Sequence, residues 1–350
     1  MALKCQSLSE RERSEGARFV EWFGWQAAAD FGDWLSEYDL VRSGCGLSVL
    51  PGMACVRTAG QDARDYLHRR LTATISRLSP GEGTRAALLT GEGRMLADCL
   101  VLCTGATEFL LVAPPACAAT LASHVERYVI REDCTVENQS DHLAVLSLDG
   151  PAASDCLTGL KLETVGRHAF LRENPSALVV RTDSLGVQGY YVIVPMADAP
   201  AVWENLRSRV GGLCGLTARE TVRVESGIPL YGRDMDETTI PLEAGLEAII
   251  DFNKGCFPGQ EIVARMRNLG HPAKVMVGLR FDGENPPPPT TALADGATIV
   301  GRVTSGVWSP ALGSPLALAT VKWAYRETGT NLRANGRQAT VWSLPVTPRP

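Results

Sequence analysis

Apolar residues recur with two different periods between residues 48 and 140 and divide this stretch into short elements. The segment "GMACVRTAG" alternates like a strand, and Tyr66, Leu67 and Leu71 then fall at helical spacing. Two apolar runs flank "TGEG", which predicts a β-hairpin, and "EFLLVAP" and "PACAATLASHVERYVI" predict a strand and an amphipathic helix. The order strand, helix, hairpin, strand, helix is typical of an antiparallel α+β unit.

A similar order of elements follows, which predicts a second αβ unit. The segment "LAVLSLDGPAASDCLTGL" predicts a strand and a helix, and "ALVVRTD" and "GYYVIVP" predict two strands around a turn at Ser184 to Gly189. "PAVWENLRSRVGG" predicts a helix that ends at glycines. By contrast, the aromatic-rich segment "ARFVEWFGWQAAADFGDWLSEYDLVRSG" near the amino terminus predicts a loop leading into a short helix.

The segment "FDGENPPPPTTALADG" marks a change of composition. Four consecutive prolines cannot continue a helix or a central strand, so we expect a stiff surface connection. Beyond it, "ATIVGRVTSGVWSP", "PLALATVKW" and "QATVWSLPV" are short apolar runs parted by glycine and proline. This spacing predicts a small β-barrel.

The totals describe an ordinary globular chain of more than one domain. Its 350 residues exceed what one core usually organises, and 45% hydrophobic with 21% charged residues is far from a disordered composition. A formal net charge of -5 without a basic run excludes a typical nucleic-acid binder. No apolar stretch is long enough to cross a bilayer, and the start lacks the apolar core of a secretory signal, so we expect a cytoplasmic protein without membrane partners.

The ten cysteines show no metal-binding or disulfide pattern. There is no C-x-x-C pair and no histidine at zinc-finger spacing, so we expect no metal site. Cys99 and Cys103 lie within a strand-like apolar run, where small buried side chains are more typical than metal ligands. Cys256 differs, because "KGCFPGQE" (254–261) holds it at a bend between glycines, beside Lys254 and ahead of a predicted helix.

The segment "TARETVRVESGIPLYGRDMDETTIPLEAGL" resembles the T-protein family of the glycine cleavage system, the tetrahydrofolate-dependent aminomethyltransferases. The family's R-x-E-x-G-x-P-L-Y-G-x-D run is nearly complete from Arg223 to Asp234, and "GRMLADCLV" and "GRVTSGVWSPALGSPLALATV" resemble its hairpin and its carboxy-terminal barrel. Residues 254–261 match K-G-C-[FY]-x-G-Q-E, the signature of a sister group, the YgfZ-type folate-binding proteins. Members of that group act in the synthesis or maintenance of iron–sulfur enzymes.

This resemblance implies an α+β fold class, a T-protein-like ring of three domains around a central folate channel. Two αβ (ferredoxin-like) units and a C-terminal small β-barrel would form the ring. Residues 1–47 and 141–270 would be a discontinuous first domain carrying the octapeptide, residues 48–140 the second domain, and residues 271–350 the barrel. The implied cofactor is tetrahydrofolate or a folate derivative, and folate is the implied partner.

Asp98 is the first catalytic candidate, because it aligns with the T-protein aspartate near the folate nitrogen that accepts the one-carbon unit. A carboxylate there would orient the amine and stabilise developing positive charge. On a regular strand, Asp98 shares a face with Leu96 and Leu100, and a charge on an apolar face needs a reason. The alternative is an aspartate at a strand edge that hydrogen-bonds to backbone.

Arg219, Arg223 and Tyr231 are cofactor-binding candidates in the best-matched run. Arginine pairs bidentately with carboxylates, which folate carries on its glutamyl tail. Arg223 alternates with two valines, which predicts a strand with the arginine facing away from them; the alternative is a surface ion pair with Glu220 or Glu225. Tyr231 would either stack on the pterin or pack beneath the following turn.

Residues 183–191, "DSLGVQGYY", depart from the T-protein pattern. They keep the family's glycines, but Val187, Gln188 and Tyr191 replace its acidic positions. In the family, acidic groups there recognise the amino-pyrimidinone edge of the pterin, which offers a pair of donors. Their loss counts against chemistry identical to that of the T-protein.

Cys256 is the second catalytic candidate. Lys254 and a helix beginning near Gly259 would favour its thiolate, which could attack an electrophile, ligate iron or join a mixed disulfide. Gln260 and Glu261 would cap or orient the bend, and with Lys254 they complete the cofactor-binding candidates. The alternative is a structural turn whose cysteine packs inward.

Together these features favour a tetrahydrofolate-binding YgfZ-like protein that supports synthesis or repair of iron–sulfur enzymes through Cys256. Its partners would then include iron–sulfur proteins or their assembly factors. The competing hypothesis is a tetrahydrofolate-dependent aminomethyltransferase, or a related one-carbon transferase or demethylase, in which Asp98 polarises the reaction. A third hypothesis is a folate-gated scaffold that docks a partner through residues 254–270.

Overall fold

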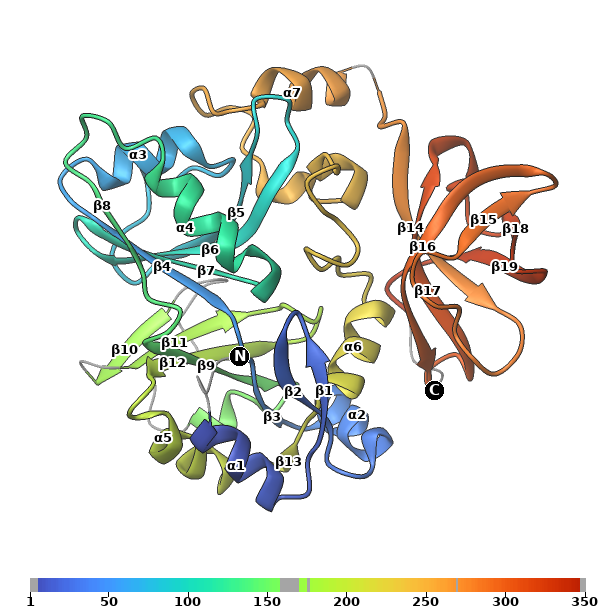
Figure 1. Ribbon diagram of the computed structural model, residues 1–350, viewed down its shortest axis with the longest axis horizontal. Helices are drawn as coiled ribbons and strands as arrows, with labels where there is room; N and C mark the ends of the chain where they lie inside the picture. The colour runs from blue at the N-terminus through green and yellow to red at the C-terminus, as the bar shows by residue number, and fades with distance from the viewer. Residues whose placement is uncertain (1–5, 158–169, 175–176, 269, 347–350) are drawn as a thin grey trace.

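The computed structural model describes residues 6–157, 170–174, 177–268 and 270–346. Two β-sheets with their helices and a closed β-barrel lie in a triangular arrangement (Figure 1). The predicted α+β class and the predicted carboxy-terminal β-barrel are therefore confirmed. Among the described residues, no helix is long and apolar enough to span a bilayer.

One sheet has six strands in the order β10-β11-β12-β9-β3-β13, antiparallel except where β13 meets β3. Its strands are β3 (Gly46–Val49), β9 (Leu143–Asp149), β10 (Phe170–Asn174), β11 (Ala177–Thr182), β12 (Gly189–Pro195) and β13 (Gly212–Leu213). The helices of this part are α1 (Gln6–Ser14), α2 (Trp34–Ser43), η2 (Asp155–Leu157), α5 (Ala199–Arg207) and α6 (Leu216–Glu225). Since β3 pairs with β9, the chain enters this sheet, leaves it for residues 54–138 and returns. The end of the segment predicted as a helix after β9, residues 158–160, lies outside the described residues.

The other sheet has five strands in the order β5-β6-β7-β4-β8. Its elements are β4 (Ala54–Ala59), α3 (Ala63–Arg70), β5 (Gly83–Leu89), β6 (Met95–Gly105), β7 (Glu108–Ala113), η1 (Pro115–Cys117), α4 (Ala118–Glu126) and β8 (Thr135–Asn138). The predicted order of elements is present, and β5 and β6 form the hairpin expected around "TGEG". The edge strand β8 is the addition that the sequence did not predict.

The two sheets pack face to face, and this packing fixes where Asp98 points. Leu100 of β6 and Val145 of β9 belong to one hydrophobic core between the sheets. Cys99 belongs to the core on the other face of the five-stranded sheet, beneath α3 and α4. Because side chains alternate along a strand, Asp98 lies on the Leu100 side, facing the six-stranded sheet.

The barrel closes in the order β14-β17-β16-β15-β18-β19. Its elements are β14 (Lys274–Phe281), β15 (Ala292–Asp295), β16 (Thr298–Ser309), β17 (Ser314–Lys322), η6 (Trp323–Tyr325), β18 (Asn331–Ala334) and β19 (Arg337–Trp342). The three predicted runs are β16, β17 and β19. The barrel nevertheless begins with β14, so the proline run connects two barrel strands and does not precede the barrel.

The amino-terminal aromatic segment is a β-hairpin and not the predicted loop. Strands β1 (Arg18–Trp22) and β2 (Trp25–Asp30) pair antiparallel and precede α2. The turn residues Phe23 and Gly24 both have positive φ, 51° and 80°, as a two-residue hairpin turn requires. Phenylalanine in the first position hid the turn, because such turns are usually marked by Asn-Gly or Asp-Gly.

Arg223 lies on helix α6 and not on the strand that its alternation with valines predicted. Ala218 and Val222, one helical turn apart, are both fully buried, as are Val224 and Glu225 on another side of the helix. The helix contacts β2 on one side and β16 and β17 of the barrel on the other. Val222 and Val224 are both fully buried on this helix, so their alternation with the charged Arg223 and Glu225 resembled the period of a strand.

Residues 231–263 pack on the five-stranded sheet. Met235, Ile249, Phe257 and Val263 are buried members of its core, contributed by η4 (Pro241–Ala244), η5 (Glu247–Ile249), α7 (Gln260–Asn268) and their connections. The predicted domain boundaries, which place this segment with residues 1–47, stay a proposal. The packing adds that the octapeptide contacts the second unit.

Candidate functional site

A cavity of about 160 Å³ lies where the two sheets meet α1, the β1–β2 hairpin and α6. One water needs about 15 Å³ of such volume, so the cavity holds on the order of ten waters or a small ring system. Three predicted site residues line it, namely Asp98, Arg219 and Arg223. The other five lie elsewhere, namely Tyr231, Lys254, Cys256, Gln260 and Glu261.

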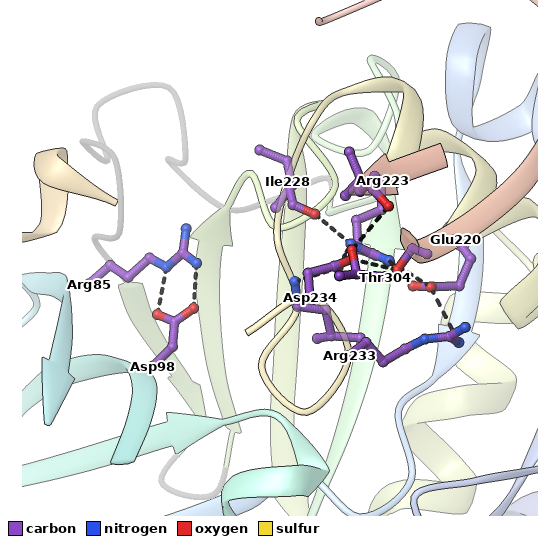
Figure 2. A network of polar contacts seen from close by, with 11 residues as sticks. Arg85, Asp98, Glu220, Arg223, Ile228, Arg233, Asp234 and Thr304 are labelled. Atoms are coloured by element: carbon purple, nitrogen blue, oxygen red, sulfur yellow. Dashed lines mark hydrogen bonds and ion pairs between the residues drawn. The ribbon is translucent and has the colours of Figure 1, made fainter. Parts of the chain in front are cut away.

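Asp98 is paired with Arg85 across the β5–β6 hairpin. Arg85 Nε donates to Asp98 Oδ1 at 2.7 Å, and Arg85 Nη2 donates to Oδ2, a parallel two-bond arrangement visible in Figure 2. The Asp98 side chain is 7% exposed and that of Arg85 is 26% exposed. The aspartate is therefore held in one orientation at the cavity wall, and it is not the backbone-bonded edge residue of the alternative interpretation.

Arg223 has all its donors engaged by protein groups. A guanidinium carries five N–H groups. Nε and Nη2 donate to the two Glu220 oxygens at 2.8 and 2.9 Å, and Nη2 also donates to Ser305 Oγ at 2.9 Å. Nη1 donates to Asp234 Oδ2 at 2.6 Å and to the Ile228 carbonyl, as Figure 2 shows in part. No N–H of Arg223 is left for a ligand carboxylate here, so the role predicted for it stays a prediction.

Arg219 is the second arginine of α6 in the cavity wall, one turn before Arg223. Its Nη1 forms an ion pair with Asp149 at the end of β9, and the Asp149 carboxylate also accepts from Ser147 Oγ at 2.7 Å. Among the described residues, Asp149 is the carboxylate paired with Arg219. Arg219 therefore keeps more of its hydrogen-bonding capacity for a ligand than Arg223 does.

Tyr231 packs beneath a turn, as in the second of its two interpretations. It is 6% exposed and belongs to the core of the five-stranded sheet. Its hydroxyl donates to the Met95 carbonyl at 3.3 Å. In this position it supports the start of β6, the strand that carries Asp98.

Lys254 joins the octapeptide to the second unit through hydrogen bonds. Its Nζ donates to the carbonyls of His68, Leu71 at 2.6 Å and Ala73 at 2.9 Å, which uses all three ammonium N–H groups. Burial lowers the pKa of Lys254 to about 8. The lysine therefore positions the segment, and its role as a cofactor-binding residue stays a prediction.

The glycine before α7 lets the octapeptide touch the tip of the Asp98 hairpin. Gly259 has φ +79°, and a Cβ there would lie 2.5 Å from the Gly93 Cα and 2.6 Å from the Thr90 carbonyl oxygen. Phe257 is buried in the adjoining core. The helix predicted after Gly259 is present, with Gln260 as its first residue. Gly259 thus places the end of the octapeptide against the tip of the hairpin.

Cys256 is the exposed member of the nine described cysteines; the other eight are buried. The buried ones include Cys99 and Cys103, as their apolar surroundings predicted. The sulfhydryl at the bend is accessible to solvent, but it does not line the cavity. Among the described residues, no group of three His, Cys, Asp or Glu side chains could hold a metal ion.

The turn between β11 and β12 contributes Asp183, Ser184 and Leu185 to the cavity, and β12 contributes Tyr191. Burial raises the pKa of the Tyr191 phenol, so it stays protonated. This part of the wall therefore presents a neutral phenol, the Ser184 hydroxyl and the Leu185 side chain beside Asp183.

Arg85 and Glu12 are among the ionisable residues of the cavity that the sequence did not single out. Arg85 could have been found by register, since Ala87 pairs with Asp98 across the hairpin and Arg85 lies two residues away on the same face. No comparable signal exists for Glu12, which comes from α1, far from the matched motifs.

Comparison with known proteins places these features in context. Residues 8–254 match the model described as "GCVT N-terminal domain", and residues 274–348 match the "Glycine cleavage T-protein C-terminal barrel domain". An aminomethyltransferase of Saccharopolyspora erythraea is 33% identical over 346 residues, covering 95% of this chain and 94% of that protein. One of Rubrobacter xylanophilus is 33% identical over 326 residues, covering 91% and 87%.

A solved structure is similar over almost the whole chain. It is the crystal structure of glycine cleavage system aminomethyltransferase T from Bartonella henselae, with a TM-score of 0.90 and 26% sequence identity. The similarity covers 97% of each chain. Both sheets and the barrel therefore have counterparts in that protein.

Proposed function

The chain belongs to the glycine cleavage T-protein family, and we propose that it is a tetrahydrofolate-dependent aminomethyltransferase or a closely related one-carbon transferase. The observation that carries this proposal is the position of Asp98 in the wall of a ring-sized cavity. Relatives that match the chain nearly end to end bear the name aminomethyltransferase, which supports it. This reverses the order in which the sequence alone ranked the two main hypotheses.

The residues around the cavity fit a folate. Apolar side chains such as Val49, Leu50 and Met53 give a flat ring an apolar surface, and Asp98 and Arg219 supply charges of both signs. When bound, tetrahydrofolate would supply the amine nitrogen that accepts the one-carbon unit.

Asp98 has the chemistry for a charge-stabilising role. Each carboxylate oxygen offers two lone pairs, so the two bonds from Arg85 leave acceptor capacity for a ligand N–H. Because Arg85 fixes the carboxylate before any ligand arrives, little reorganisation is needed when positive charge develops on a nearby nitrogen. We assign Asp98 the orienting and stabilising role, and Arg85 the role of holding it.

The test is aminomethyl transfer to tetrahydrofolate from a panel of amine donors, comparing the wild type with Asp98→Asn. The expected result is turnover with at least one donor, reduced in the variant by about 100-fold or more in kcat/KM. Asp39→Asn, an exposed aspartate on α2, should keep full activity as a control. Absence of turnover with every donor, or full activity of Asp98→Asn, would reject the proposal.

A second candidate function is the YgfZ-type role in synthesis or repair of iron–sulfur enzymes. The complete octapeptide and the exposed position of Cys256 favour it. Under this second proposal, iron–sulfur proteins or their assembly factors are the partners, and the protein acts in the cytoplasm.

Complementation separates the two candidates. In cells lacking the native gene, Cys256→Ala should fail to restore iron–sulfur enzyme activity if the second candidate is right, whereas Asp98→Asn should restore it. Cys256 lies outside the cavity, so its loss should leave folate binding unchanged in either case. Full rescue by Cys256→Ala would remove the thiol from the mechanism.

A further inference from the structure

Glu12 is a buried acid in the wall of the cavity. It lies on α1, the residue is 4% exposed, and it lines the cavity together with Ala27 and Ala28 of β2. It shares this cavity with Asp98, which comes from the other sheet.

Within the described part of the chain, no group hydrogen-bonds or ion-pairs with the Glu12 carboxyl. Burial raises the pKa of Glu12 to about 8. A carboxyl removed from water without a partner costs free energy, so the fold gains nothing from having one here.

Other charged side chains on and just after α1 behave differently. Arg11 pairs with Glu204 of α5 at 2.8 Å, and Glu15, which follows α1, pairs with Arg207 of α5 at 3.0 Å. Arg13 lies over the Phe19 ring. Each of these groups is held at the surface, whereas Glu12 points to the cavity side of the same helix.

We propose that Glu12 is a ligand-recognition residue whose carboxyl accepts adjacent N–H donors of a planar heterocycle, such as the amino-pyrimidinone edge of a pterin. This inference rests on the proposed function and names a contact for it. The chemistry follows from the acceptor pair that a carboxylate presents, which matches two parallel N–H groups. The turn at 183–191 does not supply this match from Val187, Gln188 or Tyr191.

Ligand binding should then release a proton. With a pKa of about 8, Glu12 is mostly protonated at pH 7 in the free protein, and a pair of N–H donors favours its charged form. The charged groups on the elements around α1 are engaged in their own pairs, Arg18 with Asp30 and Arg207 with Glu15. Affinity should therefore rise between pH 6 and pH 8 and level off above that.

The experiment is calorimetric titration of the full chain with folinic acid, in two buffers of different ionisation enthalpy. We expect the wild type to bind with release of close to one proton per ligand at pH 7. Glu12→Gln should bind about 10- to 100-fold more weakly, release no proton and show a flat pH profile. Glu10→Gln, an exposed glutamate on the same helix, should behave as the wild type.

An analogue of folinic acid in which a methyl group replaces the 2-amino group adds a readout that a structural role would not affect. The difference in affinity between wild type and Glu12→Gln should be smaller for this analogue than for folinic acid, because one of the two N–H donors is missing from both complexes. Glu12→Gln should also unfold at the same or a higher temperature than the wild type, since it removes an uncompensated buried acid.

The outcomes separate this inference from the proposed function. Equal affinity and equal proton release in the wild type and Glu12→Gln would overturn the role of Glu12 while leaving folate binding intact. A lower unfolding temperature of Glu12→Gln together with an equal loss for both ligands would assign Glu12 a structural role instead. No binding of folinic acid by the wild type would overturn both proposals.

Discussion

At the scale of single residues, the site is defined by which charges are already paired. Arg223 and Lys254 were attractive as ligand-binding groups in the sequence, yet their N–H donors are fully used by protein acceptors. Asp98 and Arg219 keep capacity for a ligand. The sequence reveals which charges a chain has, but their availability depends on partners contributed by distant segments.

The Arg85–Asp98 pair predicts an asymmetric response to mutation. Arg85→Met leaves the Asp98 carboxylate buried without its counter-charge, so it should lower the free energy of unfolding by about 2 kcal/mol. In the double variant Arg85→Met/Asp98→Asn no charge is stranded, so much of that loss should be recovered. Urea unfolding of the four members of this cycle measures the coupling.

The matched comparison is Arg57→Met, which breaks an ion pair with Glu108 at 2.6 Å in the same sheet, where both side chains are about one-third exposed. That loss should be smaller, because solvent compensates the charge left behind. Equal losses in the two single arginine variants, or no recovery in the double variant, would contradict the assigned pairing.

At the scale of elements, the features that depend on neighbouring residues were predicted correctly. The features that depend on contacts with distant segments were not. The β5–β6 hairpin and the face of Asp98 followed from a turn and an alternation contained in about twenty residues. Helix α6 was predicted as a strand because the barrel strands that bury its outer side are distant in sequence. The position of Glu12 in the cavity could not be predicted for the same reason, since only the folded chain brings α1 to the cavity.

The octapeptide shows how an element-level structural role can look like a chemical signature. Lys254 and Gly259 secure the segment to the second unit, and Phe257 fills its core. These contacts explain Lys254 and Gly259 without reference to the thiol. They do not explain Cys256, which is exposed.

At the scale of the whole molecule, two buried carboxylates connect the barrel to the rest. Asp234 accepts from Thr304 at 2.6 Å and from Ser305 at 2.7 Å on β16, in addition to Arg223. Glu225, at the end of α6, accepts from Tyr38 at 2.8 Å and pairs with Arg42. Arg223, which borders the cavity, is thus held by the same Asp234 carboxylate that contacts the barrel.

On the barrel side, the Ser309 hydroxyl and the backbone N–H of Ala311 donate to Glu225 Oε1. Glu225→Gln keeps the shape of the side chain but leaves Arg42 without its negatively charged partner. The free energy of unfolding should therefore fall by about 3 kcal/mol. Ser309→Ala removes one neutral donor and should cost about 1 kcal/mol.

Hydrogen exchange should accelerate in α2 and in residues 309–314 of Glu225→Gln, because these segments meet at that carboxylate. If both variants cost the same and exchange is unchanged in α2, the barrel is attached mainly by the apolar contacts of Val224 with Leu316 and Leu318.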